Sequence, residues 1–218
     1  MESYKRNQIE DAIFRTLGAQ GARTEELRFR IKRLLVADRK LGCNAHADDE
    51  EDRRYAFYSE EQPGSGAEVM FSAYEGFALL AAVVLLEHGW PQARVVRVLR
   101  KVRRQFEAAY KQTLKRDPKA LFDWDAVVAQ ARPGMIAADN THPVFLVIVR
   151  LTGSSVSHEG GGAAAVCYGH GGVMEFLRKS SVAGNGAGAT FFEFVRLMHT
   201  FATNLAVTRP VKRGRPSR

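Results

Sequence analysis

The chain has 218 residues, of which 45% are hydrophobic and 26% charged, and its 32 Lys and Arg against 24 Asp and Glu leave a formal charge of +8. These proportions are typical of a globular protein, which excludes disorder of the whole chain, and the two cysteines have no CxxC spacing that would indicate a zinc site or a disulfide framework. The longest apolar run, Phe77–Leu86, is half the roughly 20 residues of a membrane helix, and the first residues lack a secretory signal, so we expect a cytoplasmic protein without membrane contact.

Two helices are predicted first along the chain. Asn7 is the expected N-cap of a helix that ends at Gly18. Thr24 is the expected N-cap of a second helix, which runs from Glu25 to about Leu41 and places acids in its first turn and cations in its last.

The segment after these helices predicts a loop and a β-hairpin. The acidic run 48–52 has nothing to position its carboxylates, so we expect a solvated loop there. Arg54–Ser59 and Glu68–Phe71 contain aromatic or β-branched residues on either side of the turn-rich segment 62–66, which is typical of two paired strands.

A buried helix and a basic helix are expected next. Ser72 and Glu75 form a capping box that opens an apolar helix to about His88, and its all-round hydrophobicity predicts a place in the core. After Gly89, a second helix is predicted over Pro91–Arg116. Two helices joined by a turn of this length are compatible with a helix-turn-helix or with a plain helical hairpin.

The basic helix carries a dense group of cations. Four of them recur at spacings of three and four and share one face, and two more flank that face: Arg94, Arg97, Lys101 and Arg104, with Arg100 and Arg103. No acid lies between the first and last of these six residues. A solvated amphipathic face is one interpretation, but like charges at this spacing repel, which favours a surface that meets a polyanion.

The second half of the chain predicts mixed structure. We expect a helix over Asp123–Ala131, a domain boundary after it, strands at Val144–Leu151 and Ala163–Tyr168, and a short helix over Val173–Lys179. Thr190 and Glu193 have the spacing of a capping box and predict a final helix to about Val207. The expected class is therefore mostly α (α+β): a helical module with a β-hairpin over 1–132, a small α+β module over 140–207, and a disordered basic tail over 208–218.

The tail contains the sequence Lys212-Arg-Gly-Arg-Pro216, which resembles the AT-hook family over about nine residues. An extended Arg-Gly-Arg segment has no Cβ at its centre, so it fits a minor groove roughly 6 Å wide. The resemblance implies that Arg213, Gly214 and Arg215 read an A·T-rich minor groove, that Pro216 directs the chain outwards, and that Lys212 reaches a phosphate. There is one hook rather than several, so a second DNA contact is needed, for which the basic helix is the candidate.

The order of predicted elements over residues 7–116 also resembles the MerR-type winged-helix regulators. The segments Arg53–Tyr58 and Phe71–Glu75 are similar to the way that family enters its wing and the following helix. The resemblance implies that two helices and the wing contact DNA. The long second helix and the acidic loop depart from the family pattern.

These observations predict a DNA-binding regulatory or nucleoid-associated protein that contacts double-stranded, A·T-rich DNA through the basic helix and the tail. The alternative is a non-enzymatic adaptor that binds an acidic protein partner through the basic helix. A third hypothesis, an enzyme built on His158 and Glu159, has no HExxH motif, serine elbow or triad behind it, so we expect no enzymatic activity, no cofactor and no metal. A homodimer would match DNA half-sites related by two-fold symmetry.

Overall fold

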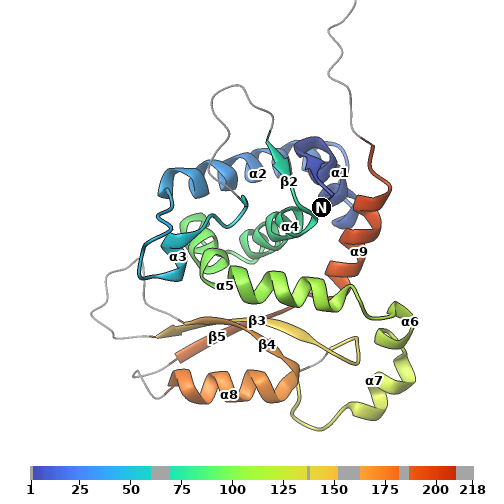
Figure 1. The fold of residues 1–218 in the computed structure, drawn as a ribbon. Coiled ribbons are helices and arrows are strands. Elements are labelled where there is room, and N and C mark those ends of the chain that lie inside the picture. The colour runs from blue at the N-terminus through green and yellow to red at the C-terminus, as the bar shows by residue number, and fades with distance from the viewer. Residues whose placement is uncertain (1, 60–68, 137, 152–162, 182–186, 210–218) are drawn as a thin grey trace, which may run out of the picture. The chain divides into compact units, whose positions relative to one another are not determined.

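The computed structural model describes residues 2–59, 69–136, 138–151, 163–181 and 187–209 (Figure 1). Most of these residues are helical, which confirms the mostly α (α+β) class. The helices are α1 (Arg6–Thr16), α2 (Ala22–Leu41), α3 (Glu50–Arg53), α4 (Ala73–Glu87), α5 (Gln92–Thr113), α6 (Pro118–Leu121), α7 (Trp124–Gln130), α8 (Gly169–Ser181) and α9 (Val195–Ala206). The strands are β1 (Tyr4–Lys5), β2 (Met70–Phe71), β3 (Val144–Leu151), β4 (Ala164–Tyr168) and β5 (Ala187–Glu193).

The chain divides into two compact units. Unit 1 comprises residues 1–100 and 200–218, and unit 2 comprises residues 101–199. Both boundaries fall inside helices, α5 and α9, and not in the 132–140 region where the sequence predicted a boundary. A helix that continues through a boundary carries no Pro, Gly or polar cluster to mark it, so sequence composition gives no signal there.

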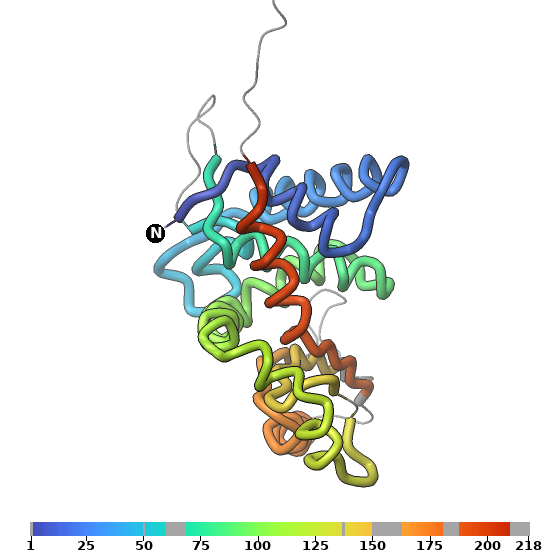
Figure 2. Tube along the Cα trace, turned by 90° about the vertical axis from the view of Figure 1, so that its right-hand side faces the viewer, coloured from blue at the N-terminus to red at the C-terminus, as the bar shows by residue number. Residues whose placement is uncertain are grey.

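Unit 1 is built around α4. Its capping box is confirmed: the Glu75 backbone N–H donates to Ser72 Oγ (3.2 Å), and the Ser72 N–H donates to the Glu75 carboxylate (2.8 Å). Residues on all sides of α4 are buried, as its sequence predicted, and α1 and α2 lie on one side of it (Figures 1 and 2). At Gly76 the packing is so close that a Cβ atom would lie 2.5 Å from Ile9 Cδ1 and 2.9 Å from Phe201 Cζ.

The predicted β-hairpin is wrong. Met70–Phe71 is a strand, but it pairs antiparallel with Tyr4–Lys5 at the start of the chain, and Arg54–Ser59 forms no strand. The backbone N–H groups of Ala56 and Phe57 donate instead to the two oxygens of the Asp38 carboxylate, at 3.1 and 3.0 Å. A side-chain acceptor inside the unit thus replaces the strand partner that the aromatic pattern predicted.

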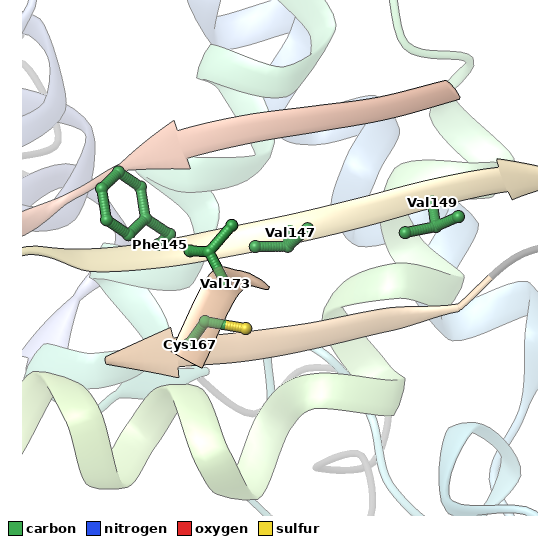
Figure 3. Close-up of a cluster of buried hydrophobic side chains, with 5 residues drawn as sticks. All are labelled: Phe145, Val147, Val149, Cys167 and Val173. Carbon is green, nitrogen blue, oxygen red and sulfur yellow. The ribbon is translucent and has the colours of Figure 1, made fainter. Parts of the chain in front are cut away.

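Unit 2 contains a three-stranded antiparallel sheet of order β4-β3-β5. The predicted strands at Val144–Leu151 and Ala163–Tyr168 are confirmed as β3 and β4. Phe145, Val147 and Val149 point to one face of β3, where they form a buried cluster with Cys167 of β4 and Val173 of α8 (Figure 3). β3 is the central strand, and its residues Val144–Val149 are buried on both faces, which agrees with the continuous apolar run of this segment.

The capping box predicted at Thr190 and Glu193 is also wrong, because Ala187–Glu193 is the strand β5 and the helix α9 begins only at Val195. The β-branched and aromatic residues of this segment pair with β3 along its whole length. Glu193 still caps the helix, since its Oε1 accepts the Val195 N–H at 3.0 Å.

Candidate nucleic-acid interface

The cations of α5 occupy three different environments. Arg94 and Arg97 are half-buried in unit 1, Lys101 and Arg104 are exposed in unit 2, and Arg100 and Arg103 are buried. The helix was thus placed correctly by its sequence, but its cations do not form one solvated surface. Arg94 lies with its guanidinium 5.8 Å from the centre of the Trp90 ring, where a cation and an aromatic face attract each other.

Arg100 must be removed from the predicted set of phosphate contacts. Its side chain is 1% exposed, and its Nε lies 2.6 Å from Asp38 Oδ1. Its other nitrogens donate to the backbone carbonyls of Asp38, Gly42 (2.7 Å) and Glu51 (3.3 Å). A guanidinium with this many internal acceptors has a structural role, because it satisfies carbonyls at the end of α2 and in α3.

Arg103 is also removed from the predicted set, since its residue is only 5% exposed. It shares its side of α5 with Leu99 and Phe106, which lie one turn away on either side and are buried. The physical reason for both errors is the same: the apolar stripe of α5 is wider than the sequence pattern indicated, and two long cationic side chains lie within it.

A second group of cations, which sequence reasoning did not select, lies on α2 in unit 1. The exposed members in the second half of the helix are Lys32, Arg33, Arg39 and Lys40. Gln92 Nε2 donates to the Arg33 carbonyl at 3.1 Å, and the Arg100–Asp38 ion pair joins the same two helices further along. The exposed cations of α2 therefore lie on a helix that is hydrogen-bonded to the first turns of the basic helix.

Within the stretch from Leu27 to Gly42 the only acid is Asp38, and its charge is compensated internally by Arg100. The acids near the start of α2, Glu25 and Glu26, form ion pairs with Arg28 and Arg30. Residues 27–37 contain four cations and no acid, and this run is the sequence signal that could have identified α2.

Two apolar side chains interrupt the cations of α2. Phe29 is 65% exposed and Val36 is 40% exposed, and their spacing with Arg33 and Lys40 places all four on one face of the helix. Arg39 lies elsewhere on the helix: its guanidinium is 5.7 Å from the centre of the Tyr58 ring. Burial raises the pKa of the Tyr58 phenol, so this ring stays neutral beside the cation.

The predicted tail residues, Lys212, Arg213, Gly214, Arg215 and Pro216, lie outside the described residues, as do His158 and Glu159. In the part of the chain that the structure describes, no three His, Cys, Asp or Glu residues are grouped so that they could hold a metal ion. Among the described helices, none combines the length and the apolar character that crossing a bilayer requires.

Comparisons with known proteins identify no relative: no family model, no curated protein and no solved structure matches this chain.

Proposed function

We propose that this protein binds double-stranded DNA through the exposed cations of α2 and α5, with the C-terminal tail as a second contact. The observation that carries the proposal is the buried ion pair between Asp38 and Arg100. Asp38 is the only acid between Leu27 and Gly42, and Arg100 compensates its charge inside unit 1. The exposed cations of α2 are left without a neighbouring acid from this stretch, next to a helix whose first turns are also acid-free.

A surface that carries several cations and no adjacent acid is expected to bind the phosphate backbone of a nucleic acid. Each phosphate that Lys or Arg neutralises releases condensed counterions, which provides a favourable free energy that depends on salt and not on sequence. In unit 1, the α2 cations and the half-buried Arg94 and Arg97 of α5 would supply such contacts. In unit 2, the exposed Lys101 and Arg104 of α5 would supply them separately, and all these contacts would hold the protein on DNA without reading bases.

The tail would supply preference for A·T-rich sequence. This part of the proposal rests on the resemblance of residues 212–216 to an AT-hook, in which Arg213 and Arg215 lie along the narrow minor groove and Gly214 allows the backbone to enter it. A regulatory or nucleoid-associated role follows if both contacts are made by one chain.

The test is fluorescence anisotropy of a labelled duplex over a salt series from about 50 to 200 mM. The variant Lys32→Ala/Arg33→Ala is compared with Lys115→Ala/Lys119→Ala, which removes the same charge from exposed positions in unit 2. We expect the slope of log K against log salt to become shallower by roughly 0.9 for each phosphate that the α2 variant no longer neutralises, and to stay unchanged in the control.

A similar decrease of affinity in both variants would mean that only net charge matters, and the α2 surface would be rejected. If the intact protein shows no salt-dependent binding to the duplex, the DNA proposal as a whole is rejected. Deletion of residues 209–218 tests the tail separately: the difference in affinity between A·T-rich and G·C-rich duplexes should disappear.

The exposed Phe29 and Val36 favour a second candidate, an acidic protein partner that binds the same face of α2. Phosphates do not need the phenyl ring, whereas an amphipathic acidic helix would bury it. Phe29→Ser therefore separates the candidates. If the partner is DNA, the slope of log K against log salt for the duplex stays unchanged in this variant. If the partner is a protein, the intact chain binds a designed Glu- and Leu-rich helical peptide and the variant does not.

A further inference from the structure

Unit 2 contains a pocket of about 180 Å³ that the DNA proposal does not use. It is formed by the last turn of α5 and the residues after it, by the turn before β3, and by the junction of β4 and α8. The lining residues that matter chemically are Arg116, Thr141, His142, Val144, Tyr168 and Gly169.

The polar side of the pocket is cationic. Arg116 and His142 both line it. Desolvation lowers the pKa of His142, and the guanidinium of Arg116 lowers it further. The two groups are therefore close enough to repel each other when both are charged. No Asp or Glu is among the residues that line the pocket, so nothing in its wall compensates this charge.

His142 is held in a defined orientation. Its Nδ1 lies 3.0 Å from Thr141 Oγ1, and that hydroxyl lies 3.2 Å from the Ala120 carbonyl oxygen, to which it donates. The backbone N–H of His142 donates to Asn140 Oδ1 at 3.1 Å. With Nδ1 engaged by Thr141, Nε2 is the nitrogen left to act on a ligand, as an acceptor when the ring is neutral and as a donor when it is protonated.

The opposite side of the pocket is apolar. Pro143 and Val144 are buried in its wall, and the Tyr168 ring, half exposed, adds an aromatic surface. Burial raises the pKa of the Tyr168 phenol, so its hydroxyl is a neutral donor. The Gly169 N–H donates to the Pro143 carbonyl at 2.8 Å and fixes the two walls to each other.

We propose that this pocket binds a small organic anion, with a carboxylate or phosphate group at Arg116 and His142 and an apolar or aromatic body against Val144 and Tyr168. A guanidinium recognises both kinds of anion by charge-assisted hydrogen bonds. The volume lies below the roughly 300–1,000 Å³ of sites for drug-sized ligands, so the ligand is limited to a few more atoms than a single ring.

Isothermal titration of the full chain with benzoate, phenyl phosphate and inorganic phosphate tests the proposal, with benzyl alcohol as the neutral control. We expect at least one aromatic anion to bind and the alcohol not to bind. Tighter binding of benzoate assigns the anionic group as a carboxylate, and tighter binding of phenyl phosphate assigns it as a phosphate. Binding of inorganic phosphate as tight as that of phenyl phosphate would contradict the role of the apolar wall.

Variants identify the site. Arg116→Gln should weaken binding by about tenfold or more, as removal of a charge-assisted hydrogen bond does. Lys115→Gln, which removes a neighbouring exposed cation outside the pocket lining, should leave binding unchanged. The site is overturned if neither aromatic anion binds, or if Lys115→Gln weakens binding as much as Arg116→Gln does.

The dependence on pH is an independent readout. The titratable or charged groups that line the pocket with His142 are Arg116, three residues after the end of α5, and Tyr168, the last residue of β4. A bound anion favours the protonated imidazole, so benzoate affinity should rise as the pH falls through the pKa of His142, and His142→Gln should remove this rise. An unchanged pH profile in His142→Gln would exclude His142 from the site.

Discussion

Arg100 shows what a guanidinium needs when it is buried. Its charge is compensated by Asp38, and its remaining donors are used by backbone carbonyls of α2, Gly42 and α3. Asp38 in turn accepts two backbone N–H groups from the segment that the sequence predicted as a strand. One ion pair therefore joins four segments of unit 1, and removal of either partner leaves the other charge uncompensated.

We predict that Arg100→Ala lowers the free energy of unfolding by about 3–5 kcal/mol, the decrease expected when one partner of a buried pair is removed. The adjacent exposed residue provides the control, since Lys101→Ala should change it by about 0.5 kcal/mol or less. Urea denaturation measures both. In the double variant Asp38→Ala/Arg100→Ala the decrease should be smaller than the sum of the two single decreases, and strict additivity would contradict the pairing.

Gly76 is the position where the core of unit 1 has no room for a methyl group. We predict that Gly76→Ala destabilises the protein by about 1–3 kcal/mol because the Cβ atom meets Ile9 and Phe201, and that this outweighs the gain of roughly 1 kcal/mol in helix propensity. Gly171→Ala is the matched control, because a Cβ atom there has no heavy atom within 4 Å. A neutral or stabilising Gly76→Ala in urea denaturation would show that the core can rearrange.

At the scale of elements, Glu193 connects two structures in unit 2. Its Oε1 accepts the Val195 N–H at the start of α9 (3.0 Å) and the Val144 N–H at the start of β3 (3.4 Å). Burial raises the pKa of this carboxyl and outweighs the hydrogen bonds, which lower it, while the Asp139 carboxylate adds to the rise. The native state therefore holds a proton on Glu193 more tightly than the unfolded chain does.

The sign of the pH dependence follows from this difference. Stability contributed by the protonated carboxyl is present at low pH and is lost as the pH rises from the ordinary value of 4.5 through the raised pKa. We predict that Glu193→Gln keeps the acceptor and removes this decline, as measured by urea unfolding at pH 5 and pH 8. In Glu175→Gln the decline should persist, because the ammonium of Lys179 lowers the pKa of Glu175 and gives it the opposite sign.

The elements that sequence predicted correctly are those whose signals are local. The capping box of α4, the turn at Gly89 after it, and the apolar run Val144–Val149 of β3 each lie within or directly beside the element they define. Two local predictions were nevertheless wrong, since α1 and α2 are preceded by Lys5 and Gly21 and not capped by Asn7 and Thr24. The errors in strand assignment occurred where a distant partner decides. Arg54–Ser59 is held by Asp38, and Thr190–Glu193 pairs with β3, so neither outcome could be inferred from the segment alone.

The same distinction applies to the candidate sites. The sequence identified the cations of α5, but the burial of Arg100 and Arg103 depends on what packs against that helix. The sequence did not select His142 or Arg116 for any site, because the fold of unit 2 brings them into one pocket from positions 26 residues apart.

At the scale of the whole molecule, the charge of +8 acts against folding through mutual repulsion. The exposed ion pairs along α1 and α2 offset little of it, since such pairs contribute about 0–1 kcal/mol each. We predict that raising sodium chloride from about 10 to 150 mM, which shortens the screening length from roughly 30 to 8 Å, increases the melting temperature by about 2–4 °C. A decrease, measured by circular dichroism in the absence of DNA and other anions, would mean that attraction between charges exceeds repulsion.

Unit 1 is assembled from both ends of the described chain. Phe201 of α9 packs close to Gly76, and Asn204 Nδ2 donates to Thr16 Oγ1 across 188 positions of sequence at 3.0 Å. During synthesis, the whole of unit 2 leaves the ribosome before Phe201 and Asn204 are available to α1 and α4. Unit 1 is therefore begun before unit 2 and completed after it. Until α9 is available, the apolar surface of Ile9 and Phe77 that it covers is exposed and has to be shielded from other chains.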